Sequence, residues 1–362
     1  MERRAFVKKS LALGTMGGAL SLATPAVNVI AKKKKFRWRL VMAIPKTLPI
    51  WGSGVERFAE RVEKMSGGDL SIRVYGAGEL VPALGTLDAV SAGRVQMGHS
   101  ASYYWAGKIP AAVFFTAVPF GLNAIGMKAW LKAGGGQQLW DEVYAPHGIR
   151  AFPAGNTGMQ MGGWFKKEIK TMDDFKGLKM RIPGLGGQVV AKAGGATVLV
   201  PGGEIYTNLA TGVLDAAEWV GPYHDYVMGL HKTANYYYTP GWQEPGPVLE
   251  LMVNLKAWQE LPDDLKMLVE TCAAELDRDM YAEWLAKDAE YLEKIQKETK
   301  VQVLNFPPDV LSALKKLSQE AQEEMAKANP LAKKVLDSFL SFKSRFDALQ
   351  NVTERAYAKA DQ

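Results

Sequence analysis

Arg181 and Glu218 are the charged residues whose positions most need an explanation. Arg181 lies near the end of a short alternating strand, residues 179–182, and a glycine-rich stretch that starts a predicted helix follows it. A guanidinium offers a carboxylate a planar pair of donors, and a helix start offers free backbone N–H groups. Glu218 interrupts an apolar strand, residues 216–220, so its carboxylate is paired, bound to a cation, or placed at the mouth of a cleft. These residues predict a binding site, and a salt bridge is the alternative for Arg181.

Three further clusters combine aromatic and polar side chains at breaks in the chain. They are WQEP at residues 242–245, NTGMQ at residues 156–160, and the aromatic run at residues 103–105. Such a cluster, taken alone, is more often part of a packed core than of a site. Together the clusters supply the remaining candidates, which are Asn156, Gln160, Gln243, Glu244 and Tyr103.

Motifs of common enzyme classes are lacking in this sequence. Its 4 histidines have no metal-binding spacing and no partner cysteines. There is no nucleophile elbow and no phosphate-binding loop. The stretch GLGGQV at residues 184–189 lacks the final glycine and the acidic residue of a dinucleotide fingerprint. A binding protein therefore fits the sequence better than an enzyme.

Two α/β units must position these residues. Strands and helices alternate over residues 36–98, and a second alternating series begins at residue 157. Two echoes relate the series: residues 70–78 resemble 178–186, and residues 87–98 resemble 206–217. The first echo makes Arg73 the rival of Arg181. We expect an α/β fold with two lobes facing a ligand cleft, the architecture of a ligand clamp, and a long C-terminal helical tail.

The expected boundaries follow from this pattern. Lobe I spans residues 36–155 with a return segment at about 239–290, and lobe II spans 156–238 with a return segment at about 291–330. Residues 331–362 form the tail. Its apolar residues Val335, Phe339, Phe342, Phe346 and Leu349 recur every three or four positions, so they share one helical face. That face is buried either on the chain's own lobes or against a second subunit.

The N-terminus has the features of a twin-arginine export signal. Arg3 and Arg4 precede a weakly apolar stretch, and small residues offer cleavage after Ala26 or Ala31, so we assign residues 1–31 to the signal peptide. Residues 1–35 hold eight Lys or Arg and one Glu, which gives this segment a net charge of +7, whereas the formal net charge of the whole chain is +6. The remainder is near −1 and carries no basic stripe, which argues against nucleic-acid binding.

Several segments resemble a known family. KTMDDFKGLKMRIPG at 170–184, LATGVLDAAEW at 209–219 and PGPVLELMVN at 245–254 resemble the periplasmic substrate-binding subunits of tripartite ATP-independent periplasmic (TRAP) transporters, the DctP family. MQMGGW at 159–164, AAEWVGP at 216–222 and the twin-arginine leader are similar to the subgroup that binds 2-oxo acids and lactate. The resemblance covers essentially the whole chain.

The resemblance implies roles for individual residues. Arg181 would bind the ligand carboxylate, and a sodium or calcium ion would bridge ligand and protein. The implied cation ligands are Gln160, Glu218, the carbonyl of Trp219, and Gln243 or Glu244. The predicted ligand contacts are Gln160, Arg181, Trp219, Asn156 and Tyr103. The implied partners are TRAP membrane subunits and a second copy of the chain, which would form a dimer through the C-terminal helix. The alternative function is a twin-arginine-exported periplasmic enzyme with a metal or organic cofactor.

Overall fold

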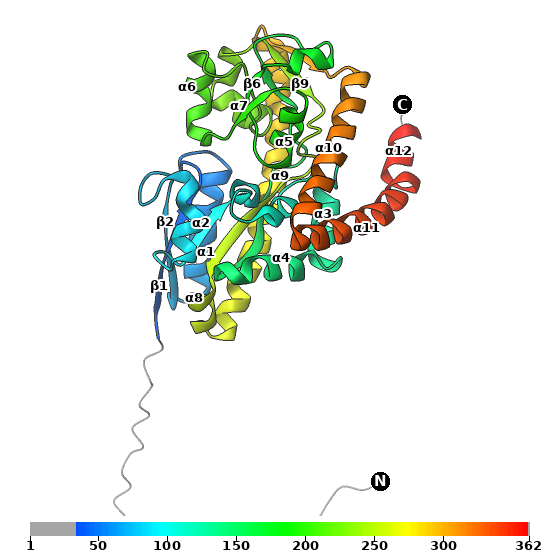
Figure 1. The fold of residues 1–362 in the computed structure, drawn as a ribbon. Coiled ribbons are helices and arrows are strands. Elements are labelled where there is room, and N and C mark those ends of the chain that lie inside the picture. Colours follow the sequence, from blue (N-terminus) through cyan, green and yellow to red (C-terminus); the bar gives the residue numbers. More distant parts are fainter. Residues whose placement is uncertain (1–33, 361–362) are drawn as a thin grey trace, which may run out of the picture. The chain divides into compact units, whose positions relative to one another are not determined.

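The computed structural model describes residues 34–360 of the 362-residue chain. The predicted signal peptide, residues 1–31, lies outside the described residues. Lys35–Gln362 form one compact unit, and helices surround its two β-sheets (Figure 1). In the described part of the chain, no helix is long and apolar enough to cross a membrane.

The first sheet has five strands in the order β2-β1-β3-β10-β4. They are β1 (Phe36–Met42), β2 (Leu70–Tyr75), β3 (Met97–Ser100), β4 (Ile149–Asn156) and β10 (Val248–Asn254). β1 pairs in parallel with β2 and β3, whereas β10 runs antiparallel to both of its neighbours. Every residue of β10 is buried, in keeping with its nearly continuous apolar sequence.

The second sheet has six strands in the order β11-β9-β5-β8-β6-β7. They are β5 (Gly163–Phe165), β6 (Lys179–Arg181), β7 (Ala196–Val198), β8 (Ala216–Ala217), β9 (Tyr236–Thr239) and β11 (Gln302–Asn305). β6 pairs in parallel with β7 and β8, and β5 is antiparallel to β8 and β9. The predicted division of the chain into lobes, with its boundaries, stays a prediction.

Helices connect and cover the strands. The α-helices are α1 (Trp51–Met65), α2 (Thr86–Ser91), α3 (Ala124–Ala133), α4 (Gly136–Tyr144), α5 (Gly184–Lys192), α6 (Ile205–Ala210), α7 (Pro222–Val227), α8 (Leu255–Glu260), α9 (Asp263–Glu298), α10 (Pro308–Ala328), α11 (Pro330–Val352) and α12 (Glu354–Ala360). Short 3-10 helices are η1 (Ala83–Gly85), η2 (Ser102–Trp105), η3 (Pro110–Phe115), η4 (Ala145–His147), η5 (Met172–Phe175), η6 (Gly202–Glu204) and η7 (Leu230–Lys232). The predicted fold class, α/β with two sheets and a long helical C-terminus, is confirmed.

The topology corrects one of the two sequence echoes. In the first sheet β1 pairs in parallel with both β2 and β3. In the second sheet β6 has the equivalent position, because it pairs in parallel with both β7 and β8. The echo of residues 87–98 in 206–217 is right, because it aligns α2-β3 with α6-β8. The echo of residues 70–78 in 178–186 is wrong, because it aligns β2 with β6. Val41 pairs with Gly98 and Arg181 with Ala217, so Val41, and not Arg73, is the counterpart of Arg181.

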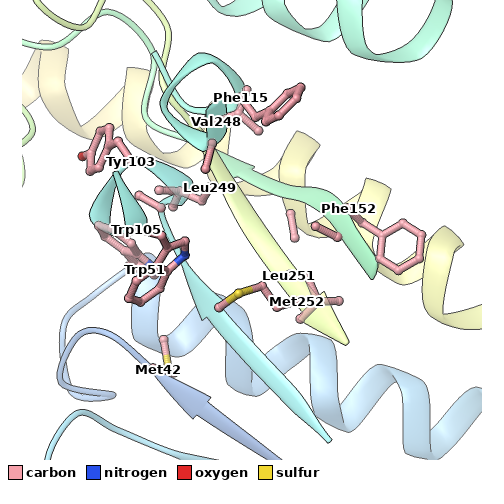
Figure 2. Packing of buried hydrophobic residues seen from close by; sticks show 14 of the residues in the cluster. Met42, Trp51, Tyr103, Trp105, Phe115, Phe152, Val248, Leu249, Leu251 and Met252 are labelled. Atoms are coloured by element: carbon pink, nitrogen blue, oxygen red, sulfur yellow. The ribbon is translucent and has the colours of Figure 1, made fainter. Parts of the chain in front are cut away.

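The interior of the first sheet is built from large apolar side chains. Figure 2 shows Trp51 of α1, Trp105 of η2 and Leu251 of β10 among the residues of this buried cluster. One carboxylate, Glu250, lies in this interior and accepts hydrogen bonds from Trp105 Nε1 at 2.6 Å and from the Tyr144 hydroxyl at 2.7 Å. Burial raises the pKa of Glu250 to about 7, and the two hydrogen bonds oppose that rise.

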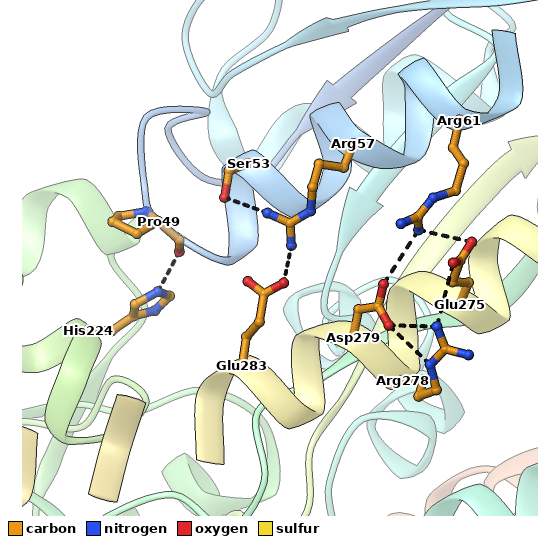
Figure 3. Close-up of polar contacts among 9 residues, drawn as sticks. All are labelled: Pro49, Ser53, Arg57, Arg61, His224, Glu275, Arg278, Asp279 and Glu283. Atoms are coloured by element: carbon orange, nitrogen blue, oxygen red, sulfur yellow. Dashed lines mark hydrogen bonds and ion pairs between the residues drawn. The ribbon is translucent and has the colours of Figure 1, made fainter. Parts of the chain in front are cut away.

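The long helix α9 packs against both halves of the fold. Its N-terminal and central part contacts α1, where Glu275 and Asp279 face Arg61 and Glu283 faces Arg57 (Figure 3). Further along α9, Asp288 and Tyr291 contact Tyr223 of α7. Close by, the ring of His224 on α7 is 2.7 Å from the carbonyl oxygen of Pro49 in the β1–α1 loop. The ion pairs are about one-third exposed and contribute little to stability, so the buried apolar contacts dominate here.

The C-terminal stripe divides into a buried and an exposed part. Val335 and Phe339 are fully buried, and the Phe339 ring meets Trp130 of α3 edge to face at 5.2 Å. Phe342 and Phe346 are partly buried beside Gly134 and Gly126. The first part of the stripe therefore covers the chain's own body. Three apolar residues near its end remain open and form what we call the tail-end patch: Leu349 at 54% exposure, Val352 at 75% and Tyr357 at 74%.

Candidate functional site

Arg181 is a fully buried arginine at the end of β6, with 1% of its surface exposed. Its Nη1 donates to the Glu218 carbonyl at 2.8 Å and forms an ion pair with Glu218 Oε1. Its Nη2 lies 3.4 Å from the Tyr104 hydroxyl. Arg73, the predicted rival, is exposed and lies over the Tyr75 ring on an edge strand. Of these two arginines, Arg181 is the one that lies in a desolvated polar cluster.

Strand topology brings Arg181 and Glu218 together. β6 and β8 are parallel neighbours, Arg181 is the last residue of β6, and Glu218 directly follows β8. Side chains at the carboxyl ends of adjacent parallel strands meet at one sheet edge, where ligands of open α/β sheets bind. The Glu218 N–H donates to the Arg181 carbonyl at 3.1 Å, which fixes this pair through the backbone as well. Arg181 is thus paired with Glu218 at a strand end, and its role in ligand binding stays a prediction.

The two predicted glutamines come from the segments that cross between the sheets. Gln160 follows β4, and its Nε2 donates to Thr157 Oγ1 at 3.3 Å. Gln243 precedes β10, and its Nε2 donates to the Met161 carbonyl at 2.8 Å. Both amide nitrogens are thus used by the protein. The Gln243 amide is also close enough to Glu218 to lower the pKa of that carboxylate.

Three buried oxygens of this cluster have no hydrogen-bond partner among the described residues. They are Gln160 Oε1, Glu218 Oε2 and Gln243 Oε1. A buried acceptor without a partner costs about 1–3 kcal/mol. Carboxylate and amide oxygens are the ligands that hard cations prefer. Within residues 34–360 there is no group of three or more His, Cys, Asp or Glu that could hold a metal, so any cation here depends on the amide oxygens. The donor set fits sodium or calcium rather than a transition metal.

Glu244 adds a second carboxylate to the cluster. It is 3% exposed, and its Oε2 lies 3.5 Å from the Tyr103 hydroxyl. Burial and the charge of Glu218 raise the pKa of Glu244 well above its usual value, while Arg181 lowers it. Burial likewise raises the pKa of Glu218 to about 7, against the lowering effect of Arg181. One guanidinium therefore faces two buried carboxylates. A bound cation would supply the positive charge that this cluster lacks.

The indole of Trp219 forms a wall of the site. Its ring stacks on Trp51 of α1 with centroids 6.0 Å apart, and the Arg181 guanidinium lies 5.2 Å from its centroid. A Cβ on Gly202 would lie 2.2 Å from this indole, so glycine is required there. Trp219 also lines a cavity of about 430 Å³ between the 45–49 loop and residues 202–206 and 227–228. The Trp219–Trp51 stack therefore joins the two halves of the fold at the site.

Not every predicted contact has the same support. Tyr103 lies against Glu244, as described above. Asn156 accepts from the Gly158 N–H at 2.8 Å, and its Nδ2 is 3.5 Å from the Gly246 carbonyl. Its side chain holds the crossover turn, and a contact of Asn156 with the ligand stays a prediction.

Sequence reasoning missed three residues of the cluster. Tyr104 was noticed only as part of the aromatic run at residues 103–105, and no motif singled out Trp51. Asp225 on α7 is 1% exposed, and burial raises its pKa to about 6. An acidic residue directly after a histidine in GPYHDY was the available signal for Asp225. The contacts of Trp51 are long-range and left no local signal.

Comparisons with known proteins place this geometry in context. The family model described as bacterial extracellular solute-binding protein, family 7, named DctP, matches residues 43–329. A monocarboxylate 2-oxoacid-binding periplasmic protein of Nostoc sp. is 44% identical over 359 residues, which are 99% of this chain and 98% of that protein.

Two solved structures illustrate the similarity in three dimensions. A TRAP periplasmic solute-binding protein from Pseudoalteromonas atlantica, with bound sodium and pyruvate, has a TM-score of 0.88 and 43% identity, covering 90% of this chain and 99% of that one. A TRAP solute-binding protein from Bordetella bronchiseptica has a TM-score of 0.88 and 38% identity, covering 90% and 97%. It is described as a mixed-occupancy dimer, with copurified calcium and picolinate in one active site and the other site apo.

Proposed function

Because the chain belongs to the DctP family of bacterial extracellular solute-binding proteins, we propose that it captures a small 2-oxo or 2-hydroxy monocarboxylate, such as pyruvate or lactate, together with a cation. It then delivers this ligand to the membrane subunits of a TRAP transporter. The chain is a periplasmic 2-oxo-acid receptor of that transporter type and not an enzyme. The alternative of an exported enzyme finds no support in the comparisons.

One observation carries the proposal. A buried arginine at a strand end is paired with Glu218, and three buried oxygens of the candidate ligands Gln160, Glu218 and Gln243 have no partner among residues 34–360. Arg181 supplies a planar donor for a carboxylate, and the oxygens of Gln160, Glu218 and Gln243 supply a hard-cation site. A 2-oxo acid presents a carboxylate and an adjacent oxygen, which match a guanidinium and a cation together.

The residues have distinct tasks in this proposal. Arg181 neutralises the ligand carboxylate, and Glu218 supplies the negative charge that holds the cation. Gln160, Gln243, Glu244 and the Trp219 carbonyl complete the candidate cation ligands, while Tyr103 and Asn156 are candidate ligand contacts. The cation supplies a positive centre for the ligand's chelating oxygens. Small ligands bury little area, so a few directed contacts must provide most of the affinity.

The direct test is a calorimetric titration with pyruvate. The protein is stripped with a chelator in sodium-free potassium buffer and titrated with and without calcium. We expect binding that is tightened at least tenfold by calcium. Absence of pyruvate and lactate binding under all of these conditions would refute the ligand class, whereas binding that ignores the cation would refute only the cation bridge.

The route of export is also a proposal. The twin-arginine pattern at Arg3 and Arg4 supports transport of the folded protein across the membrane, with cleavage after Ala26 or Ala31. We expect intact mass spectrometry of periplasmic protein to give a chain that starts at residue 27 or 32. A Lys–Lys substitution for Arg3-Arg4 should trap the precursor in the cytoplasm. A periplasmic protein that retains residues 1–26 would contradict this prediction.

We further propose a homodimer joined through the tail-end patch. The patch exposes three large apolar side chains at 54–75%, and the Bordetella neighbour is described as a dimer. Deleting the whole tail is a poor test, because Val335 and Phe339 belong to the core. We expect Val352→Glu combined with Tyr357→Glu to halve the mass measured by light scattering.

A matched control separates the patch from general surface effects. Leu340 is 45% exposed on α11, and it lies nine residues before Leu349, about half a turn around the helix. Leu340→Glu should therefore leave the mass unchanged. Wild-type protein with the mass of a single chain at micromolar concentration would disprove the dimer.

A further inference from the structure

Asp225 is a buried carboxylate that holds the backbone next to the site. Its Oδ1 accepts from the Val220 N–H at 3.2 Å. Its Oδ2 accepts from Trp164 Nε1 at 2.8 Å and from the Tyr237 hydroxyl at 2.7 Å. The rings of Trp164 and Tyr237 stack at 4.0 Å, which fixes the two donors relative to each other. The carboxylate is therefore locked in one orientation on α7, with one oxygen available to the backbone.

The Val220 N–H and the Trp219 carbonyl belong to the same peptide unit. In a planar trans peptide these two groups point in opposite directions. The Trp219 carbonyl therefore points away from Asp225. No hydrogen-bond donor within the described residues 34–360 reaches that carbonyl, although Trp219 is only 4% exposed.

The backbone groups on either side of Trp219 already form hydrogen bonds within the protein. The Glu218 N–H donates to the Arg181 carbonyl, and the Glu218 carbonyl accepts from Arg181 Nη1. The Val220 carbonyl accepts from the Met161 N–H at 3.2 Å. These bonds hold the chain on both sides of Trp219, so the carbonyl of Trp219 is the remaining acceptor of the segment.

We propose that Asp225 is a positioning residue for the cation site, a role that rests on the proposed function. By accepting from the Val220 N–H, it fixes the plane of the 219–220 peptide and holds the Trp219 carbonyl toward the cation. A carboxylate on the N–H side also polarises the peptide, which makes its carbonyl oxygen a better cation ligand. Asp225 itself does not touch ligand or cation. It acts as an outer-shell partner, and the loss of such partners typically weakens metal binding 10- to 100-fold.

The test compares Asp225→Asn with Trp164→Phe at pH 8. Asparagine keeps the shape of the side chain but removes its charge, whereas Trp164→Phe removes one donor to Oδ2 and keeps the Asp225–Val220 bond. Calcium affinity is measured by calorimetry on chelator-stripped protein in potassium pyruvate. We expect Asp225→Asn to bind calcium about 10- to 100-fold more weakly. Trp164→Phe should stay within about threefold of wild type, and raising calcium should restore pyruvate binding to the Asp225→Asn variant.

The possible results separate this role from simple structural support. Equal calcium affinities in Asp225→Asn and wild type would overturn the proposal. Equal losses in both variants, or a loss of pyruvate binding that calcium does not restore, would also overturn it, because they indicate a general distortion. If calcium did not change the pyruvate affinity of the wild-type protein, the cation bridge itself would be refuted. This measurement does not depend on Asp225.

A second measurement serves if Asp225→Asn does not fold. In the wild-type protein, the amide resonance of Val220 is followed by NMR as calcium is added in the presence of pyruvate. We expect a large shift of the Val220 amide, since its peptide carbonyl gains a cation. A Val220 amide that does not move while calcium binds would overturn the proposal.

Discussion

Replacement of Arg181 with alanine should remove pyruvate binding almost completely. The guanidinium is 1% exposed, so a ligand carboxylate brought to this position would be buried without a positive partner. Truncating one member of a buried charged pair costs about 2–5 kcal/mol, which corresponds to a loss of roughly 30- to several-thousand-fold in affinity. Titration calorimetry with pyruvate and saturating calcium measures this loss.

Two further variants make the result interpretable. Arg73→Ala changes an exposed arginine on an edge strand and should leave affinity within about twofold of wild type. Arg181→Lys keeps the charge that balances Glu218 but loses the planar fork, so it should fold and still lose affinity. Equal losses in Arg181→Ala and Arg73→Ala, or full affinity in Arg181→Lys, would show that Arg181 is not the carboxylate-binding group.

The sequence contained the residue types of the site but not their pairing. A lone arginine at a strand end and a lone glutamate in an apolar strand were recognisable because each breaks its local pattern. Their contact spans 37 residues of sequence and depends on β6 and β8 being parallel neighbours. Periodicity identifies strands but does not state which strands pair, so the contact between Arg181 and Glu218 could not be predicted from the sequence.

Strand prediction failed where the local chemistry was ambiguous. β4 contains Pro153, which counts against a strand from sequence, yet β4 is an edge strand, where proline is tolerated. The repeated phrase around Arg73 and Arg181 was misleading for a related reason. Both copies read as a strand followed by a glycine turn, but one forms the edge of its sheet and the other lies within it. Only hydrogen-bond register could identify Val41 as the counterpart.

The neighbours Tyr103 and Tyr104 illustrate a further limit. In the short 3-10 helix η2, consecutive side chains point in different directions, so Tyr103 reaches Glu244 while Tyr104 reaches Arg181. The sequence presented them as one aromatic cluster. Their charged partners come from distant parts of the chain, since Arg181 ends β6 and Glu244 precedes β10.

Replacing Glu218 with glutamine should abolish the dependence of ligand binding on a cation. The amide keeps the shape of the side chain but removes the charge that attracts a hard cation. The variant should hold no calcium by elemental analysis. Its pyruvate affinity, with or without chelator, should match that of chelator-treated wild-type protein, at least tenfold below the calcium-loaded form.

Glu250→Gln is the matched control for Glu218→Gln. Both glutamates are fully buried, and burial raises the pKa of each to about 7. Glu250 differs in that Trp105 and Tyr144 satisfy both of its oxygens, whereas Glu218 Oε2 has no partner among the described residues. Loss of a buried carboxylate is therefore common to both variants, which differ in the unpartnered oxygen of Glu218 and in its ion pair with Arg181. Glu250→Gln should retain calcium-dependent binding. If Glu218→Gln kept that dependence as well, the charge of Glu218 would not be what holds the cation, and the role proposed for this carboxylate would be wrong.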